Sequence, residues 1–213
     1  MPVLIYILNA LGAYLLGSIP SGFLVAKAKG IDIRSVGSGN IGATNAMRVL
    51  GKPAGIFVLL MDALKGYAAV AWLSLALLEI FSTSTADIET LRIVAGIFAV
   101  LGHNYTCWLK FKGGKGIATT AGVYLALAPW AVLVALVVFI LAVLVTKYAS
   151  VGSVAAAIAL PVTVWVMPPH NLFLGIVTTA LGALAIYKHK SNIQRLMAGT
   201  ENRLGKKTEA RCV

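Results

Sequence analysis

The sequence predicts an all-α integral membrane protein with seven transmembrane helices. Of its 213 residues, 59% are hydrophobic and 12% are charged, and the mean hydropathy is +0.89. A soluble globule of this size needs more polar surface. The net charge of +11 comes from basic residues in short segments between apolar runs, which is the positive-inside pattern and not that of a nucleic-acid-binding protein. We expect one membrane domain over residues 1–205 and a basic tail over 206–213.

The first apolar run, residues 3–26, is long enough to span a bilayer, and Pro20 near its end predicts a kink or an unwound turn. No positively charged segment precedes the run, so we expect a retained helix and not a cleaved signal peptide. The basic residues that follow place the amino terminus outside and the next loop in the cytoplasm. They are Lys27, Lys29, Arg34, Arg48 and Lys52.

The second run, residues 53–78, contains two charged residues, Asp62 and Lys65, on one helical face. Charges within a membrane helix often mark function, but a structural ion pair that locks two helices is an equally good interpretation. An acidic external loop follows, and residues 91–109 are expected to cross back to the cytoplasm.

Residues 117–146 are ambiguous because a single helix of this length would rise about 45 Å, longer than a bilayer core requires. Two short passes that turn near Pro129 would return Lys147 to the basic side, as the positive-inside rule prefers. We therefore predict two passes here, followed by runs over 151–167 and 172–187. Seven helices then leave the carboxy terminus in the cytoplasm.

Three polar stretches fall on the predicted cytoplasmic face: residues 31–52, 110–120 and 188–205. The first contains Val-Gly-Ser-Gly-Asn-Ile-Gly-Ala-Thr-Asn, and the second contains Phe-Lys-Gly-Gly-Lys-Gly-Ile-Ala-Thr before a helix. Glycine-rich turns with bare amide groups and nearby cations favour anions. Two such loops suggest an active site at this face that binds two phosphates. The third stretch has the apolar spacing of an interfacial helix.

Other motifs are excluded by their context. Gly37, Gly39 and Gly42 match G-x-G-x-x-G but follow a membrane helix instead of a strand, and the glycine before Lys115 lacks the flanking residues of a Walker A loop. No histidine is followed five residues later by aspartate, so the usual acyltransferase dyad is absent. Without a carboxylate partner, His103 is expected to be structural. The two cysteines are far apart and receive no role.

Four segments, in this order, resemble a known family. They are Gly-Ser-Ile-Pro-Ser-Gly, Ser-Gly-Asn-Ile-Gly-Ala-Thr-Asn, Gly-His-Asn-Tyr with Phe-Lys-Gly-Gly-Lys-Gly, and His-Lys-Ser-Asn-Ile-Gln-Arg-Leu. From residue 17 to 205 the chain is similar to the bacterial acyl-phosphate-dependent glycerol-3-phosphate acyltransferases. The resemblance implies an enzyme of the bacterial inner membrane that moves a fatty acyl group from acyl phosphate to the 1-hydroxyl of glycerol 3-phosphate. Lysophosphatidate and phosphate would be the products, in phospholipid biosynthesis.

The resemblance also implies the site residues. Glycerol phosphate and the reacting centre would be held by Ser38, Arg48, Lys115, His189 and Asn192, of which Ser38, Lys115 and His189 are the catalytic candidates. The acyl-phosphate cradle would comprise Thr44, Asn45, Gly113 and Gly114. Lys115 is expected to face developing negative charge, and Arg48 to clamp a phosphate, although a helix-flanking charge is an alternative for Arg48. Ser38 is a possible nucleophile, but with no base in evidence we favour a positioning role.

An acyl phosphate is already activated, so positioning and charge stabilisation are expected to suffice without a strong base. We expect no cofactor, no obligatory protein partner and no protein-bound metal, because carboxylates are not clustered on the cytoplasmic face. The rival from another class is a small membrane transporter of a phosphorylated solute, with Asp62 and Lys65 lining its pathway. A transporter site is expected near the bilayer midplane between repeats, whereas these loops lie at helix ends. A structural partner of lipid enzymes would not require two anion loops.

Overall fold

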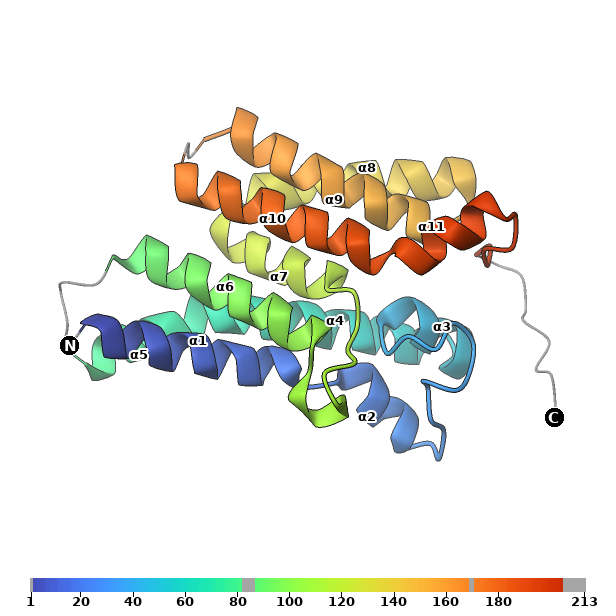
Figure 1. Ribbon diagram of the computed structural model, residues 1–213, viewed down its shortest axis with the longest axis horizontal. Helices are drawn as coiled ribbons and strands as arrows, with labels where there is room; N and C mark the ends of the chain where they lie inside the picture. The colour runs from blue at the N-terminus through green and yellow to red at the C-terminus, as the bar shows by residue number, and fades with distance from the viewer. Residues whose placement is uncertain (1, 82–86, 169–170, 205–213) are drawn as a thin grey trace.

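The computed structural model describes residues 2–81, 87–168 and 171–204, and the regular secondary structure of these residues is helical, with no strand. This confirms the all-α prediction. The long helices run along one axis, while the short helices α3 and α11 lie at the same end of the bundle (Figure 1). The helices are α1 (Pro2–Ser18), α2 (Ser21–Lys27), α3 (Ala43–Leu50), α4 (Lys52–Ala68), α5 (Ser74–Ile80), α6 (Ile88–Asn104), α7 (Ile117–Leu127), α8 (Pro129–Thr146), α9 (Ala149–Val166), α10 (Leu172–Lys188) and α11 (Lys190–Met197).

The predicted break at Pro20 is confirmed, because α1 ends at Ser18 and α2 begins at Ser21. The break exposes a carbonyl at Ile19, which accepts a hydrogen bond of 2.7 Å from the Lys65 ammonium. That ammonium also lies 2.9 Å from Asp62, whose carboxylate accepts a hydrogen bond from the Ser21 hydroxyl. The buried Asp62–Lys65 pair therefore fastens α4 to the α1–α2 break, which supports the structural interpretation of these two charges.

The predicted break near Pro129 is also confirmed, since α7 ends at Leu127 and Pro129 opens α8. Helix α7 packs on α4 and α6, whereas α8 packs mainly on α9. The backbone carbonyl of Lys147, just after α8, accepts a hydrogen bond of 2.9 Å from the Leu204 amide. The chain thus folds back at Pro129, and Lys147 lies beside the third polar stretch.

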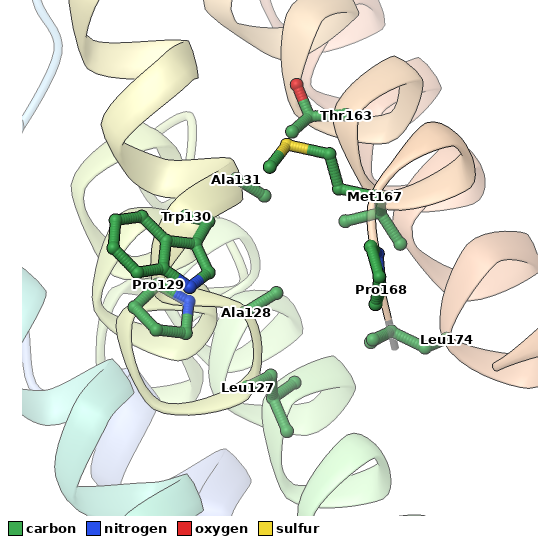
Figure 2. A pocket seen from close by; sticks show the side chains of 10 residues that line it. Leu127, Ala128, Pro129, Trp130, Ala131, Thr163, Met167, Pro168 and Leu174 are labelled. Carbon is green, nitrogen blue, oxygen red and sulfur yellow. The ribbon is translucent and has the colours of Figure 1, made fainter. Parts of the chain in front are cut away.

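A small apolar cavity of about 50 Å³ marks the opposite end of the bundle. Figure 2 shows Ala128 and Ala131 at the start of α8 on one side of it, and Met167 and Pro168 after α9 on the other. The residues of this cavity carry no charge, so the cavity is a packing gap at the turn.

Two segments differ from the sequence prediction. The helix expected over 91–109 is α6, which begins earlier, at Ile88, and ends at Asn104. It begins there because the Asp87 side chain caps it by accepting from the Glu89 amide, and it ends because Thr106 leaves the helix to donate to the carbonyl of Ser18. Helix α3, inside the first polar stretch, was not predicted.

Among the described residues, four helical segments are long and apolar enough to cross a bilayer: Val3–Lys27, Lys52–Ile80, Pro129–Thr146 and Ala149–Val166. A fifth is added if α10 and α11, which meet at a bend of 51°, count as one span. The chain is therefore built as a multi-pass membrane protein, and the seven-span count stays a prediction. The predicted tail, 206–213, lies outside the described residues.

Candidate active site

The three polar stretches meet at the end of the bundle where α3 and α11 lie, and they enclose a cavity of about 150 Å³ (Figure 1). Helices α3 and α4 provide one wall, α8, α9 and α11 another, and the start of α7 lies between them. Seven of the nine predicted site residues line this cavity: Ser38, Thr44, Asn45, Arg48, Lys115, His189 and Asn192. Gly113 and Gly114 do not.

Asn45, predicted in the acyl-phosphate cradle, holds the first loop in shape. Its side chain is buried, and its amide nitrogen contacts three backbone carbonyls, the nearest being that of Asn40 at 2.9 Å. Its amide oxygen accepts from the Ser38 backbone amide at 2.8 Å. Because Gly37 and Gly39 on either side of Ser38 have positive φ angles, the loop bends sharply there and presents Ser38 to the cavity. Asn45 therefore acts through the loop, and its amide is not a free donor for phosphate.

The sequence suggests that the backbone amides of Gly113 and Gly114 are free to bind an anion, but both amides donate hydrogen bonds within the protein. Gly113 donates to the carbonyl of Asn104 and Gly114 to that of His103, at 3.2 and 3.0 Å. A Cβ atom at Gly114 would lie 2.0 Å from the His103 ring, so no side chain fits there. The two glycines thus fasten their loop to the end of α6 and place Lys115. That Gly113 and Gly114 belong to the acyl-phosphate cradle stays a prediction, but the free amides on which it was based are absent at these two residues.

Lys115 lines the cavity just before α7 and contributes a positive charge. Its ammonium contacts the side-chain oxygen of Asn192. Burial lowers the pKa of Lys115 to about 8, and the neighbouring Arg195 adds to this shift. A lysine with a pKa in this range is still mostly charged at pH 7.

Glu201, which sequence reasoning missed, orients Asn192. Its carboxylate accepts from the Asn192 amide nitrogen at 2.7 Å, from the Arg195 guanidinium at 2.7 Å and from the Ser150 hydroxyl at 3.1 Å. A carboxylate only accepts and an ammonium only donates, so the Asn192 amide between Glu201 and Lys115 has one possible orientation. The available signal was a single acidic residue within an otherwise basic segment.

His189 follows the last residue of α10 and is buried against the cavity. Its Nδ1 lies 2.8 Å from the Ala185 carbonyl and must donate to it, because a carbonyl only accepts. Burial, helped by Lys115, lowers the pKa of His189 to about 4, so the ring is neutral at pH 7. Its Nε2 is then an acceptor.

Arg48 lies on α3, half-buried in the cavity wall. Within the described part of the chain no carboxylate lies within ion-pair distance of its guanidinium, in contrast to Arg34 and Arg195, which are paired. A guanidinium that lines a cavity and makes no ion pair of its own is suited to a ligand anion.

The expectation that His103 has no carboxylate partner is wrong. Its Nδ1 lies 3.6 Å from the Asp62 carboxylate, and both side chains are buried at the inner wall of the cavity. The pair escaped sequence reasoning because its members lie on different helices, α4 and α6.

Comparison with known proteins gives one consistent result. The family model for glycerol-3-phosphate acyltransferase matches residues 7–199. Glycerol-3-phosphate acyltransferase from Geobacter metallireducens is 50% identical over 94% of this chain and 98% of that protein, and the enzyme from Trichlorobacter lovleyi is 48% identical over 90% and 94%. The crystal structure of PlsY, an integral membrane glycerol 3-phosphate acyltransferase, in its glycerol 3-phosphate form has a TM-score of 0.83 at 38% identity, covering 94% of this chain and 96% of that one. The lysophosphatidic acid form has a TM-score of 0.80 at 37% identity and covers 94% and 95%.

Proposed function

Because the chain belongs to the glycerol-3-phosphate acyltransferase family, we propose that it transfers a fatty acyl group from acyl phosphate to the 1-hydroxyl of glycerol 3-phosphate. The products are lysophosphatidate and inorganic phosphate. The observation that carries the proposal is the single cavity lined by Arg48, Lys115, His189 and Asn192 from three separate polar stretches. Both substrates bear phosphate, and the cavity gathers cations around a neutral histidine acceptor.

In the proposed reaction, the hydroxyl oxygen of glycerol 3-phosphate attacks the carbonyl carbon of the acyl phosphate. The bond between that carbon and the bridging phosphate oxygen breaks, and phosphate leaves with the electron pair. The hydroxyl proton is transferred to phosphate, so atoms and charge balance. Negative charge develops on the carbonyl and bridging oxygens, where Lys115 can stabilise it.

The other side chains position the substrates. Arg48 binds a phosphate through its planar donor groups, and Asn192 holds the Lys115 ammonium in place. The neutral His189 can accept a hydrogen bond from the attacking hydroxyl through Nε2, which aligns its lone pair with the carbonyl carbon. Ser38, exposed at the cavity, completes the contacts from the first loop.

Ser38 is proposed to position substrate and not to form an acyl-enzyme. No base lies within hydrogen-bond distance of its hydroxyl in the described residues. The Ser38→Ala variant should lose about 10–100-fold in kcat/KM, the range of one or two lost hydrogen bonds to charged groups. Mass spectrometry of the parent enzyme incubated with acyl phosphate alone should detect no acylated Ser38. An acyl adduct on Ser38 would overturn direct transfer.

The pH dependence of activity should follow the charge on Lys115. Since its pKa is about 8 and the protonated form is the active one, kcat/KM should be constant near pH 7 with respect to this group. It should fall as pH rises through 8, approaching tenfold per pH unit. In the Lys115→Arg variant any residual activity should lack this alkaline fall, because a guanidinium stays charged. A parent profile that is flat to pH 10 would contradict the assignment.

Glu201 should affect activity through Asn192 and Lys115. The Glu201→Gln variant loses the negative charge that raises the Lys115 pKa, so the alkaline fall should move to a pH below 8. Its kcat/KM at pH 7 should drop about 10-fold. A glutamine can present its amide nitrogen as well as its oxygen to Asn192, so the Asn192 amide is no longer held in one orientation. The matched control is Glu89→Gln at the far end of α6, which should behave like the parent. An unmoved pH profile in Glu201→Gln would leave Glu201 with a structural role only.

The membrane arrangement is proposed on the same basis. Seven spans, an external amino terminus and a cytoplasmic carboxy terminus agree with the charge of the loops. They put this cavity at the cytoplasmic face of a bacterial inner membrane, where soluble glycerol 3-phosphate has access. We propose that residues 1–205 form one membrane domain, which requires no nucleic acid, cofactor or protein partner.

The direct test is an assay of purified protein in detergent with hexadecanoyl phosphate and glycerol 3-phosphate, with hexadecanoyl-CoA as the control donor. Lysophosphatidate should form from the acyl phosphate only. Formation of lysophosphatidate from hexadecanoyl-CoA alone would refute acyl phosphate as the donor. If neither donor gave lysophosphatidate, the proposed function would be refuted. Protein in vesicles that accumulates glycerol 3-phosphate without acylating it would favour the transporter instead.

A further inference from the structure

One side of the cavity is lined by apolar residues, and the proposed reaction assigns none of them a role. Leu59 from α4, Phe139 from α8, and Ile117 and Ala118 from the first turn of α7 all line it. Leu59 lies seven residues after Lys52, which opens α4, and Phe139 lies seven residues before Thr146, which ends α8. Both are therefore about 10 Å along their helices from the polar end of the bundle.

This apolar side continues onto the outer surface of the bundle. Leu59 lines the cavity although 45% of it is exposed, and its neighbours Ile56 and Leu60 are exposed as well. On α8, Leu136 and Ile140 are exposed on either side of Phe139. Since exposed apolar residues of a membrane helix face lipid, the cavity opens toward the bilayer between α4 and α8.

The Phe139 side chain packs against helix α9. Gly152 of α9 lies behind it, and a Cβ atom at that glycine would approach the Phe139 ring to 2.9 Å and the Val143 side chain to 2.6 Å. Helix α8 thus packs directly on the α9 backbone at this level. Leu59 and Phe139 are the residues through which α4 and α8 line the cavity, except for Asp62 of α4.

We infer that the acyl chain of the donor passes between Leu59 and Phe139, and that these two residues determine which chains the enzyme accepts. The inference rests on the proposed function and assigns the chain a route within the same cavity. Lipid tails are as apolar as the opening, so a chain that enters from the bilayer gains little from the hydrophobic effect. Discrimination between chains therefore depends on shape, and a bulky side chain at either position should block long chains.

The test compares hexadecanoyl phosphate with butanoyl phosphate, whose four carbons are too short to cover the distance of about 10 Å. The blocking variants are Leu59→Trp and Phe139→Trp. The matched controls are Leu60→Trp and Leu136→Trp, on the same helices at exposed positions that do not line the cavity. Each blocking variant should lose at least about 10-fold in kcat/KM for hexadecanoyl phosphate and less than about threefold for butanoyl phosphate. The controls should match the parent with both donors.

Equal losses for both donors, or no loss for either, would overturn the inference. The parent enzyme is assayed first. If the parent transfers no acyl group, the proposed function fails, whereas an active parent with the variant results just named means that only the route of the acyl chain is wrong. A second measurement needs no variant: a 16-carbon lysophosphatidate with a photoreactive diazirine in mid-chain is crosslinked to the parent. Adducts on the peptides that contain Leu59 or Phe139 support the route, and adducts found only elsewhere contradict it.

Discussion

Replacement of Lys115 by alanine is expected to lower kcat/KM about 1,000-fold or more, the largest effect of any single substitution in this site. The ammonium lines the cavity and contacts Asn192, which Glu201 orients. Removing one preorganised donor to a developing oxyanion costs about 10²–10³ in rate, and Lys115 carries a full charge in addition. The measurement is lysophosphatidate formation from hexadecanoyl phosphate in detergent.

Lys112 provides the matched control for this variant. It lies in the same glycine-rich segment, is exposed and does not line the cavity. Lys112→Ala should therefore retain activity close to that of the parent. Both variants should elute from a sizing column like the parent, because Lys115 makes no contact that joins two helices of the core. Near-normal turnover by a folded Lys115→Ala enzyme would refute its assignment.

Replacement of Arg48 by alanine is expected to raise the KM for glycerol 3-phosphate about 100-fold. Its guanidinium lines the cavity and makes no ion pair with a carboxylate of the described chain, so its donors are available to a phosphate. A bidentate, charge-assisted contact contributes about 3 kcal/mol, which corresponds to this change in affinity. Arg48→Lys should recover only part of the loss, because an ammonium cannot form the bidentate contact.

Arg34 is the control for Arg48. It belongs to the same polar stretch, but its guanidinium pairs with Asp32 at 2.7 Å outside the cavity. Arg34→Ala should leave both kinetic constants near those of the parent. The kinetics also identify the phosphate: a higher KM for glycerol 3-phosphate assigns Arg48 to the acceptor substrate, and a higher KM for acyl phosphate assigns it to the donor. Parent-like constants for both substrates would leave Arg48 with the helix-flanking role.

Much of the fold was predictable because its signals are local. The apolar runs marked the long helices, and Pro20 and Pro129 marked the two breaks, since proline lacks an amide donor. Proline by itself does not fix a break, because Pro161 lies inside α9. Helix α3 was missed because its eight residues follow a glycine-rich loop and are too few for a clear periodic pattern. The end of α6 was missed because the contact that terminates it, from Thr106 to Ser18, joins residues far apart in the sequence.

The site was predictable to a similar degree. Lys115, Arg48, His189 and Asn192 were proposed from the sequence, and all four line one cavity. The glycine loops were expected to offer bare amides, but Gly113 and Gly114 use theirs on α6. A loop packed against a helix end satisfies the helix carbonyls first, because a buried carbonyl without a partner is costly.

What the sequence alone determined is therefore the class of protein, most of its long helices and the two breaks between them. These depend on hydropathy, proline and charge along the chain, which need no knowledge of distant neighbours. The candidate site residues came from the resemblance of four short segments to a known family. The tertiary structure decided how Glu201 orients Asn192 toward Lys115, how Asn45 shapes the loop of Ser38, and how Asp62 meets His103. Such pairings join a helix to a loop or to another helix, and only the packed fold determines which donor faces which acceptor.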